Sequence, residues 1–218
     1  MKKMKAAELV LDFDLYPRNS LDPHNVKNII EAISSGIELP PVIADRKSKR
    51  VIDGFHRVRG NLRLFGDDAE ISVIEKDYRN EAAMFLDAMK YNSSHGAKLD
   101  PCDRTHCVII ASRLHIPDDA IAGALHVPIE KIGILRSDRT AMDKTGQPLA
   151  LKNTVRQQFA GKRLNQRQVE ANDRLSGMNQ QFYANQLIEL IESKMLDLKD
   201  EKLMARLKIL NDFLDEIL

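Results

Sequence analysis

The feature that most constrains this chain is a strand that passes through glycine directly into a helix. Val51-Ile52 is a short apolar strand, Asp53-Gly54 makes the turn, and apolar residues then recur at helical spacing until Gly66. The start of such a helix presents unpaired backbone N–H groups and the positive end of the helix dipole. This geometry favours a bound anion.

Two interpretations fit this turn. Arg57 and Arg59 lie in the first turns of the expected helix, and guanidinium groups bind phosphate oxygens in a fork. The alternative is a plain strand–helix junction with solvent-facing arginines, because the helix dipole alone contributes only about 0.3–1 kcal/mol. Gly54, His56 and Arg57 within one turn favour a phosphate site.

Composition places the chain among globular proteins and limits the kind of DNA binding to expect. With 218 residues, 43% hydrophobic and 30% charged, it has room for one medium domain or two to three small ones. The net charge of +1 means that any DNA-binding surface is local. Two cysteines suggest a reducing compartment, and no apolar run approaches the ~18 residues of a membrane span. Without a signal peptide, we expect a cytoplasmic protein and no membrane partner.

The first 75 residues predict a small α+β unit. Residues 9–15 alternate loosely like a strand, and a turn follows at 16–19. Asp22 is the expected N-cap and Pro23 the first-turn proline of a helix that ends near Gly36. Further strands are expected at 42–44 and 71–74, with a hairpin tip at 45–50.

Two stretches of this unit resemble the ParB/sulfiredoxin superfamily. Tyr16-Pro17-Arg18-Asn19 is similar to the family's Asn-Pro-Arg box. Asp53-Gly54-Phe55-His56-Arg57-Val58-Arg59 is similar to its Gly-Glu-Arg-Arg-x-Arg box, and keeps the glycine and two arginines. Sulfiredoxins carry a catalytic cysteine where Phe55 stands, so the resemblance excludes reduction of sulfinic acids.

The resemblance implies a nucleotide pocket. In ParB proteins this box holds the triphosphate of CTP, and other relatives use the fold as ATP- or ADP-dependent kinases. Carried over, Gly54 lets the backbone approach the phosphates, beside Phe55, while Arg57 and Arg59 contact their oxygens. His56 adds a hydrogen bond or carries a proton, and Arg18 closes over the nucleotide. The expected cofactor is CTP or ATP with Mg²⁺.

A second stretch bears on the same pocket. The expected helix from Glu81 runs into Asn92-Ser93-Ser94-His95-Gly96, where ParB proteins read Glu-Asn-x-Gln-Arg. Asn92 matches, Tyr91 replaces the acid, and the Gln-Arg pair is missing. The stretch instead resembles the Asn-x-x-His-Gly variant of ParB-like transcriptional regulators of the streptomycin-cluster type. Asn92, Ser94 and His95 therefore join the predicted nucleotide site. The alternative for His95 is a structural role, in which it binds the free backbone carbonyls at the end of the helix. Weak nucleotide hydrolysis stays open, and a binding protein is favoured over an enzyme.

The middle of the chain predicts a helix-turn-helix. After a helix that starts at Asp100-Pro101, short helices are expected at 118–125 and 129–135, joined by His126-Val127-Pro128. ParB proteins carry their helix-turn-helix at this place. Lys131 and Arg136 are the candidate phosphate contacts. The competing interpretation is a degenerate motif kept for packing.

Cys102, His106 and Cys107 do not predict a metal site. On one helix residue 107 is turned roughly 100° away from residue 106, and no second ligand pair is near in the sequence. Buried thiols are the better account, and we expect no metal.

The last third predicts a linker, a basic tract and a helical tail. Residues 138–149 contain Gly146 and Pro148 and are the expected linker. Lys162 and Arg163 belong to a basic tract that either follows a DNA backbone or forms a solvated helix face. The last helix, opened by Asp200, carries an a/d seam of Leu203, Leu207, Leu210, Leu214 and Ile217. A homodimer is favoured over a seam buried within one chain.

Together the sequence predicts an α+β fold with three parts. These are a nucleotide-binding domain at 1–96, a helix-turn-helix at 97–140 and a helical region at 141–218. The expected function is a ParB-like DNA-binding regulator or partition factor that binds double-stranded DNA and a nucleotide. The alternative is a nucleotide-dependent small-molecule kinase or nucleotidase of the same fold. A nuclease is not favoured, because we see no carboxylate cluster for metal-dependent cleavage.

Overall fold

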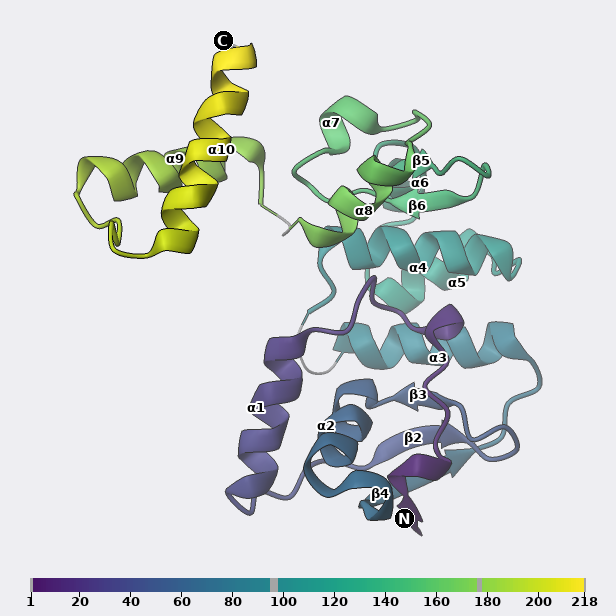
Figure 1. The fold of residues 1–218 in the computed structure, drawn as a ribbon. Coiled ribbons are helices and arrows are strands. Elements are labelled where there is room, and N and C mark those ends of the chain that lie inside the picture. Colours follow the sequence, from purple (N-terminus) through teal and green to yellow (C-terminus); the bar gives the residue numbers. More distant parts are fainter. Residues whose placement is uncertain (1, 95–97, 176–177, 218) are drawn as a thin grey trace. The chain divides into compact units, whose positions relative to one another are not determined.

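The computed structural model describes residues 2–94, 98–175 and 178–217, and the chain divides into two units, 1–177 and 178–218 (Figure 1). The first unit contains a four-stranded sheet and most of the helices. The second unit is a pair of helices.

The sheet is built from β1 (Lys2–Lys5), β2 (Val42–Asp45), β3 (Val51–Asp53) and β4 (Glu70–Lys76). Their order is β1-β4-β2-β3, with β2 parallel to β4 and the other pairs antiparallel. Side chains alternate between two cores, as the period of a strand requires. Val42 and Val51 enter one core, whereas Ile43 and Ile52 enter the other.

Two helices complete the first core. The helix α1 (Pro23–Ser34) starts where Asp22 Oδ1 accepts the N–H of His24, which satisfies one unpaired donor of its first turn. The helix α2 (Phe55–Phe65) packs closely on α1 at Gly60, where a Cβ would lie 2.7 Å from Ile29 Cγ2. A side chain at residue 60 would therefore push the two helices apart.

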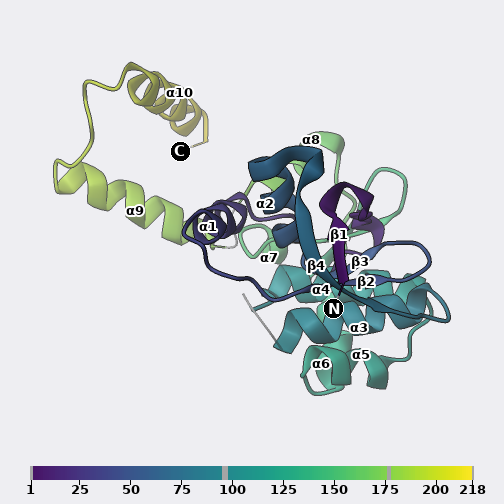
Figure 2. The same cartoon turned by 90° about the horizontal axis from the view of Figure 1, so that it is seen from below.

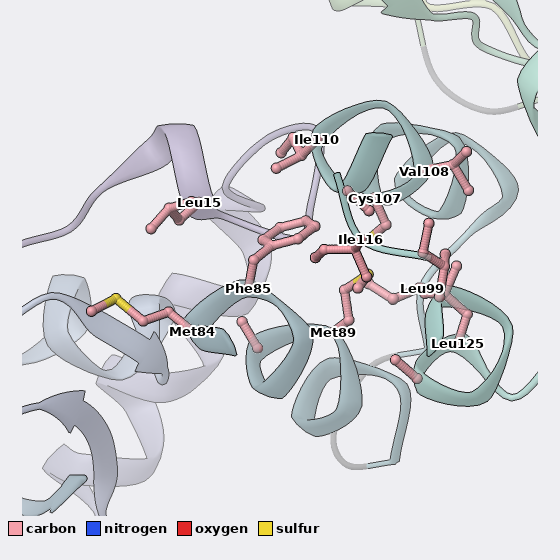
Figure 3. Packing of buried hydrophobic residues seen from close by; sticks show 14 of the residues in the cluster. Leu15, Met84, Phe85, Met89, Leu99, Cys107, Val108, Ile110, Ile116 and Leu125 are labelled. Carbon is pink, nitrogen blue, oxygen red and sulfur yellow. The ribbon is translucent and has the colours of Figure 1, made fainter. Parts of the chain in front are cut away.

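The second core lies on the opposite side of the sheet. It joins α3 (Glu81–Ser94), α4 (Pro101–Arg113), α5 (Asp118–Leu125) and α6 (Glu130–Ser137). Figure 1 shows α3 between the sheet and α4, and Figure 2 shows α3 beside α5. Phe85 and Met89 of α3 are fully buried at the centre of this core, as Figure 3 shows.

A third, smaller core stabilises residues 139–174, which we name the basic lobe. Its elements are β5 (Thr140–Met142), β6 (Pro148–Ala150), α7 (Arg156–Phe159) and α8 (Gln166–Arg174). Ala141, Leu151 and Leu164 are buried at its centre. The hairpin β5–β6 packs on α4 and α6.

The predicted strand at residues 9–15 is wrong. The segment contains the 3₁₀ turn Phe13–Leu15 and follows another at Ala6–Glu8, and Val10 makes one isolated bridge with Arg50. The edge strand is β1 instead, where only Met4 is buried among lysines. A single inward residue leaves no alternation for sequence reasoning to detect.

The predicted linker at 138–149 is also wrong, because residues 140–150 form a hairpin. Asp143 Oδ1 accepts the N–H groups of Thr145 and Gln147, and Gly146 has a φ of +87°. These are the contacts of a tight turn between two strands. A turn and a linker share the same residue types, which explains the wrong prediction.

The second unit consists of α9 (Gln180–Glu192) and α10 (Glu201–Ile217). Asp200 Oδ1 accepts the N–H groups of Lys202 and Leu203, so α10 starts as predicted. The seam residues are partly covered at the start of α10 and exposed at its end, where Ile217 is 74% exposed.

The α+β fold predicted from the sequence is confirmed. The domain limits at residues 96 and 140 stay a prediction. In the part of the chain that the structure describes, no helix is both long and apolar enough to span a bilayer.

Candidate functional site

The turn between β3 and α2 has a geometry that requires glycine. Gly54 has a φ of +112°, and a Cβ there would lie 2.8 Å from Val42 Cγ2 and 3.1 Å from Arg57 Nη2. No side chain in the described ranges caps α2. The first-turn N–H groups of α2 therefore remain available to an anion.

A cavity of about 590 Å³ lies beside this helix start. The volume is in the range of small-molecule sites. One part of its lining is apolar: Ile29, Leu39, Pro40, Pro41, Ile43, Phe55 and Ile74. The other part is polar: Tyr16, Arg18, Asn25, Asp53, His56, Arg57, Tyr91 and Asn92. The cavity thus fits a ligand with a charged end and an apolar or aromatic body.

Arg57 lines this cavity, but its guanidinium is bound by the protein. Its Nη2 donates to Asp53 Oδ2 at 2.6 Å, and its Nη1 donates to the carbonyls of Pro40 and Pro41 at 2.6 and 2.8 Å. The side chain therefore ties the segment before β2 to the start of α2. Its structural role is to hold the cavity wall, a role that the motif alone does not indicate.

His56 connects the starts of two helices. Its Nε2 accepts the backbone N–H of Asp22 at 3.2 Å, which places the ring proton on Nδ1. Burial lowers the pKa of His56, and the nearby Arg18 cation lowers it further. The ring is therefore neutral at pH 7 and acts as an acceptor within the protein.

Arg18 links the cavity to α4. Its Nη1 lies 3.5 Å from Asp103 Oδ2, and Asp103 Oδ1 accepts the backbone N–H of Asn19 at 2.9 Å. Burial is the main cause that raises the pKa of Asp103. Cys107 Sγ adds a contact to the carbonyl of Pro17 at 3.1 Å. The whole 17–19 segment is thus fixed by α4.

The remaining predicted pocket residues differ in their placement. Asn92 lines the cavity and donates from Nδ2 to the carbonyl of Ala88. Arg59 and Ser94 do not line it; Ser94 Oγ instead lies 3.1 Å from His126 Nε2. His95 lies outside the described residues.

Tyr16 is a site residue that sequence reasoning missed. It lines the cavity, stacks on Phe55 with ring centroids 4.3 Å apart, and is only 3% exposed. Its hydroxyl is buried and has no hydrogen-bond partner among the described residues. A buried hydroxyl without a partner is costly, so a ligand in the cavity would be its natural acceptor or donor. Its position directly before Pro17-Arg18, the box that resembles the family's motif, is the sequence feature that could have identified it.

The two short helices predicted as a DNA-binding unit are present as α5 and α6. His126 joins them in the left-handed conformation, with a φ of +51°, where such turns usually have glycine. Helix-turn-helix spacing requires a small residue at 122 and buried residues at 127 and 132. Ala122 and Ile132 are buried, whereas Val127 is only partly buried. This shows the two-helix geometry, while a role in DNA binding stays a prediction.

The two candidate DNA contacts on α6 have different surroundings. Lys131 is exposed. Arg136 forms a two-point ion pair with Asp118, at 2.7 and 3.1 Å, and also donates to Ser112 Oγ at 3.2 Å. The guanidinium of Arg136 therefore fixes α6 to the start of α5.

The other two candidates, Lys162 and Arg163, are exposed on the basic lobe. The carbonyl of Lys162 accepts the N–H of Met142, so this segment runs along β5.

Cys102 and Cys107 are both buried, and burial raises the pKa of each thiol. Within the described ranges there is no group of three His, Cys, Asp or Glu residues that could hold a metal ion.

Comparison with known proteins gives two relatives in sequence. A "Streptomycin biosynthesis operon possible regulatory protein" of Streptomyces griseus is 31% identical over 143 residues, 64% of this chain and 40% of the relative. The "Transcriptional regulator NovG" of Streptomyces niveus is 33% identical over 106 residues, 48% of this chain and 32% of the relative. The chain thus matches less than half the length of these curated relatives. No family model matches it.

Among solved structures, the chain is similar to a C-terminally truncated chromosome-partitioning protein ParB from Caulobacter crescentus. In its complex with the centromeric parS site the TM-score is 0.45 at 11% identity, covering 62% of this chain and 70% of that one. In its complex with CTP-gamma-S the TM-score is 0.37 at 13% identity, covering 62% and 75%. The two sequence relatives confirm the resemblance, stated from the sequence, to transcriptional regulators of the streptomycin-cluster type.

Proposed function

We propose that this chain is a ParB-like DNA-binding regulator whose glycine pocket binds a nucleotide. The observation that carries the proposal is the cavity of about 590 Å³ at the start of α2, where no side chain in the described ranges caps the helix and first-turn N–H groups can meet an anion. The names of both sequence relatives, a regulatory protein and a transcriptional regulator, support the regulatory part.

The nucleotide would bind with its phosphates at the α2 N-terminus and its base in the apolar part of the cavity. Arg18 is the cation that would meet the phosphates, because Arg57 is bound to Asp53. We favour CTP with Mg²⁺, on the resemblance of the glycine–arginine box. Titration calorimetry with CTP, ATP and ADP, each with and without Mg²⁺, measures this binding. An absence of binding heat with all three would contradict it.

Nucleotide binding would be coupled to α4 through Arg18. Phosphate oxygens compete with Asp103 for the same guanidinium, so occupancy weakens the link that fixes the 17–19 segment to α4. The helix α4 packs on both α5 and α6. A ligand that changes the contacts of α4 would therefore change the position of α6, and with it the contacts that α6 makes with DNA.

The enzyme alternative receives less support. A kinase needs a carboxylate that accepts a proton from the attacking hydroxyl. Glu31 of α1 and Glu38, which precedes β2, do not line the cavity. Asp53 does, but its Oδ2 is held by Arg57 at 2.6 Å. Binding is thus the better proposal for this pocket.

Lys131→Ala should weaken binding to duplex DNA several-fold and lower the salt slope of binding by about 1, because one phosphate contact is lost. Fluorescence anisotropy at several salt concentrations measures both quantities. Lys27→Ala removes another exposed lysine, from α1, and should change neither. An equal effect of the two substitutions would remove α6 from the DNA interface.

We also propose that residues 178–218 pair two copies of the chain. Apolar side chains on both helices are exposed, among them Ile188, Ile191 and Phe213 at 50–54%. A chain that ends at residue 177 should therefore be a monomer in light scattering, while the full chain is a dimer. If the chain that ends at residue 177 is also a dimer, the interface lies in the first unit.

A further inference from the structure

The basic lobe differs in charge from the rest of the chain. Residues 139–174 contain eight Lys and Arg against three Asp and Glu, a net charge of +5, whereas the whole chain has a net charge of +1. The acids are Asp143, Glu170 and Asp173, and the cations are Arg139, Lys144, Lys152, Arg156, Lys162, Arg163, Arg167 and Arg174. This charge sits on a folded lobe with its own core, not on a linker.

Two neighbouring backbone segments bring three of these cations together. The N–H of Leu151 donates to the carbonyl of Arg139 at 2.8 Å, so Lys152 follows directly beside Arg139. The N–H of Arg156 donates to the carbonyl of Lys152 at 3.2 Å, so the backbone makes one turn between these residues. The side chains have neighbours in common, because Arg156 lowers the pKa of Arg139, and Lys152 and Arg139 both act on the thiol of Cys102. Arg139, Lys152 and Arg156 form what we name the cation cluster.

The cation cluster is partly buried and forms no ion pair with a carboxylate among the described residues. Lys152 is only 9% exposed, and Arg139 Nη1 is enclosed without a hydrogen-bond acceptor. Arg156 Nε donates to Asn153 Oδ1 at 3.0 Å, a neutral partner. Across residues 2–94, 98–175 and 178–217, no carboxylate lies within ion-pair distance of any of the three cations.

Acidic groups in the surroundings do not remove this imbalance. Asp173 lies near enough to Lys152 for this cation to lower the pKa of its carboxyl, but burial raises that pKa more strongly and the two groups, both among the described residues, form no ion pair. Asp100 and Asp138 raise the pKa of Arg139, but burial and the neighbouring Arg156 cation lower it more strongly. Asp100 is engaged elsewhere, since its Oδ1 accepts the N–H of Asp103 at the start of α4. Burying like charges without a partner costs free energy, which a bound anion would offset.

We propose that Arg139, Lys152 and Arg156 form a binding site for a phosphate group, separate from the glycine pocket. Two guanidinium forks and an ammonium match the several oxygens of a phosphate, and Arg139 Nη1 gains the acceptor that it lacks. The phosphate is either one of a nucleic-acid backbone or a free phosphate. The site does not depend on the proposed nucleotide pocket.

The test compares the chain in phosphate and in chloride at equal pH and ionic strength. The wild type should gain roughly 3–6 °C in Tm in phosphate, because a ligand that binds the folded state stabilises it. The double substitution Arg139→Gln/Lys152→Gln should abolish this gain. Lys144→Gln, an exposed cation of the same lobe, should keep it.

A second measurement does not depend on stability. Inorganic phosphate should show a broadened ³¹P resonance with the wild type and a narrower one with Arg156→Gln, whose half-buried side chain is the safest of the three to replace. Phosphate bound in the glycine pocket would broaden the ³¹P resonance equally with both proteins. Equal Tm gains and equal line widths for wild type and variants would overturn the proposal.

Duplex DNA added to the wild type then identifies the source of the phosphate. If DNA narrows the ³¹P resonance again, the backbone occupies the cation cluster and the site is part of the DNA interface. If the resonance stays broad while DNA is bound, the site takes free phosphate. Either result supports a phosphate site, provided that Arg156→Gln has reduced the broadening.

Discussion

Gly54→Ala should abolish measurable nucleotide binding and lower the free energy of unfolding by roughly 2–4 kcal/mol. The φ of +112° is strained for alanine, and the new Cβ would lie 2.8 Å from Val42 Cγ2. Val42 is fully buried, so it cannot move away at low cost. Arg57, at 3.1 Å, is the neighbour that would shift.

The shift of Arg57 explains why binding should fail along with stability. Its guanidinium holds Asp53 and the carbonyls of Pro40 and Pro41, three groups that line the cavity. When the guanidinium moves, these acceptors lose their hydrogen-bond donor, and the residues that line the cavity at the α2 N-terminus change position. Titration calorimetry with CTP measures the binding, and urea unfolding measures the stability.

Gly36→Ala is the matched control. Gly36 has a φ of +76° at the end of α1, but nothing lies within 4 Å of a Cβ there. The substitution therefore carries the backbone strain of about 1 kcal/mol without the collision, and CTP affinity should be unchanged. Intact CTP binding by Gly54→Ala would show that the bound nucleotide does not use this turn.

Sequence reasoning predicted the elements that carry local signals. The helices α1 and α4 start at Asp22-Pro23 and Asp100-Pro101, because a side-chain acceptor and a proline act within one turn. The turn at Gly54 was equally predictable, since few residues other than glycine adopt its φ. The strand β1 was missed because its position depends on pairing with β4, about seventy residues away.

The candidate site was predictable in its residue types but not in its partners. The box around Gly54 indicated an anion site, and the structure places Gly54, His56 and Arg18 at one cavity. The contact of Arg57 with the carbonyl of Pro40 lies outside any local pattern. For Arg136, the pairing with Asp118 likewise arises from how α5 and α6 pack.

Acidification should destabilise the chain through His106, a residue of α4. Burial lowers the pKa of His106 to about 4, with Arg113 and Lys152 adding to the effect, although its hydrogen bond to the backbone of Tyr16 opposes it. The unfolded chain takes up the proton near pH 6.5, before the folded chain does. Stability should therefore fall between pH 6.5 and pH 4, by roughly 3 kcal/mol in total from this residue.

Urea unfolding of wild type and His106→Gln between pH 7.5 and pH 4 isolates this contribution. Glutamine stays neutral and can still donate to the backbone of Tyr16, so the difference in stability between the two proteins should shift in favour of the variant as the pH falls. Other titrating groups, such as the buried Asp103, cancel in this difference. His24→Gln removes an exposed histidine of α1 and should follow the wild type. If His106→Gln loses stability in parallel with the wild type, the pKa of His106 is the same in the folded and unfolded chains, and the Tyr16–His106 hydrogen bond offsets the effect of burial.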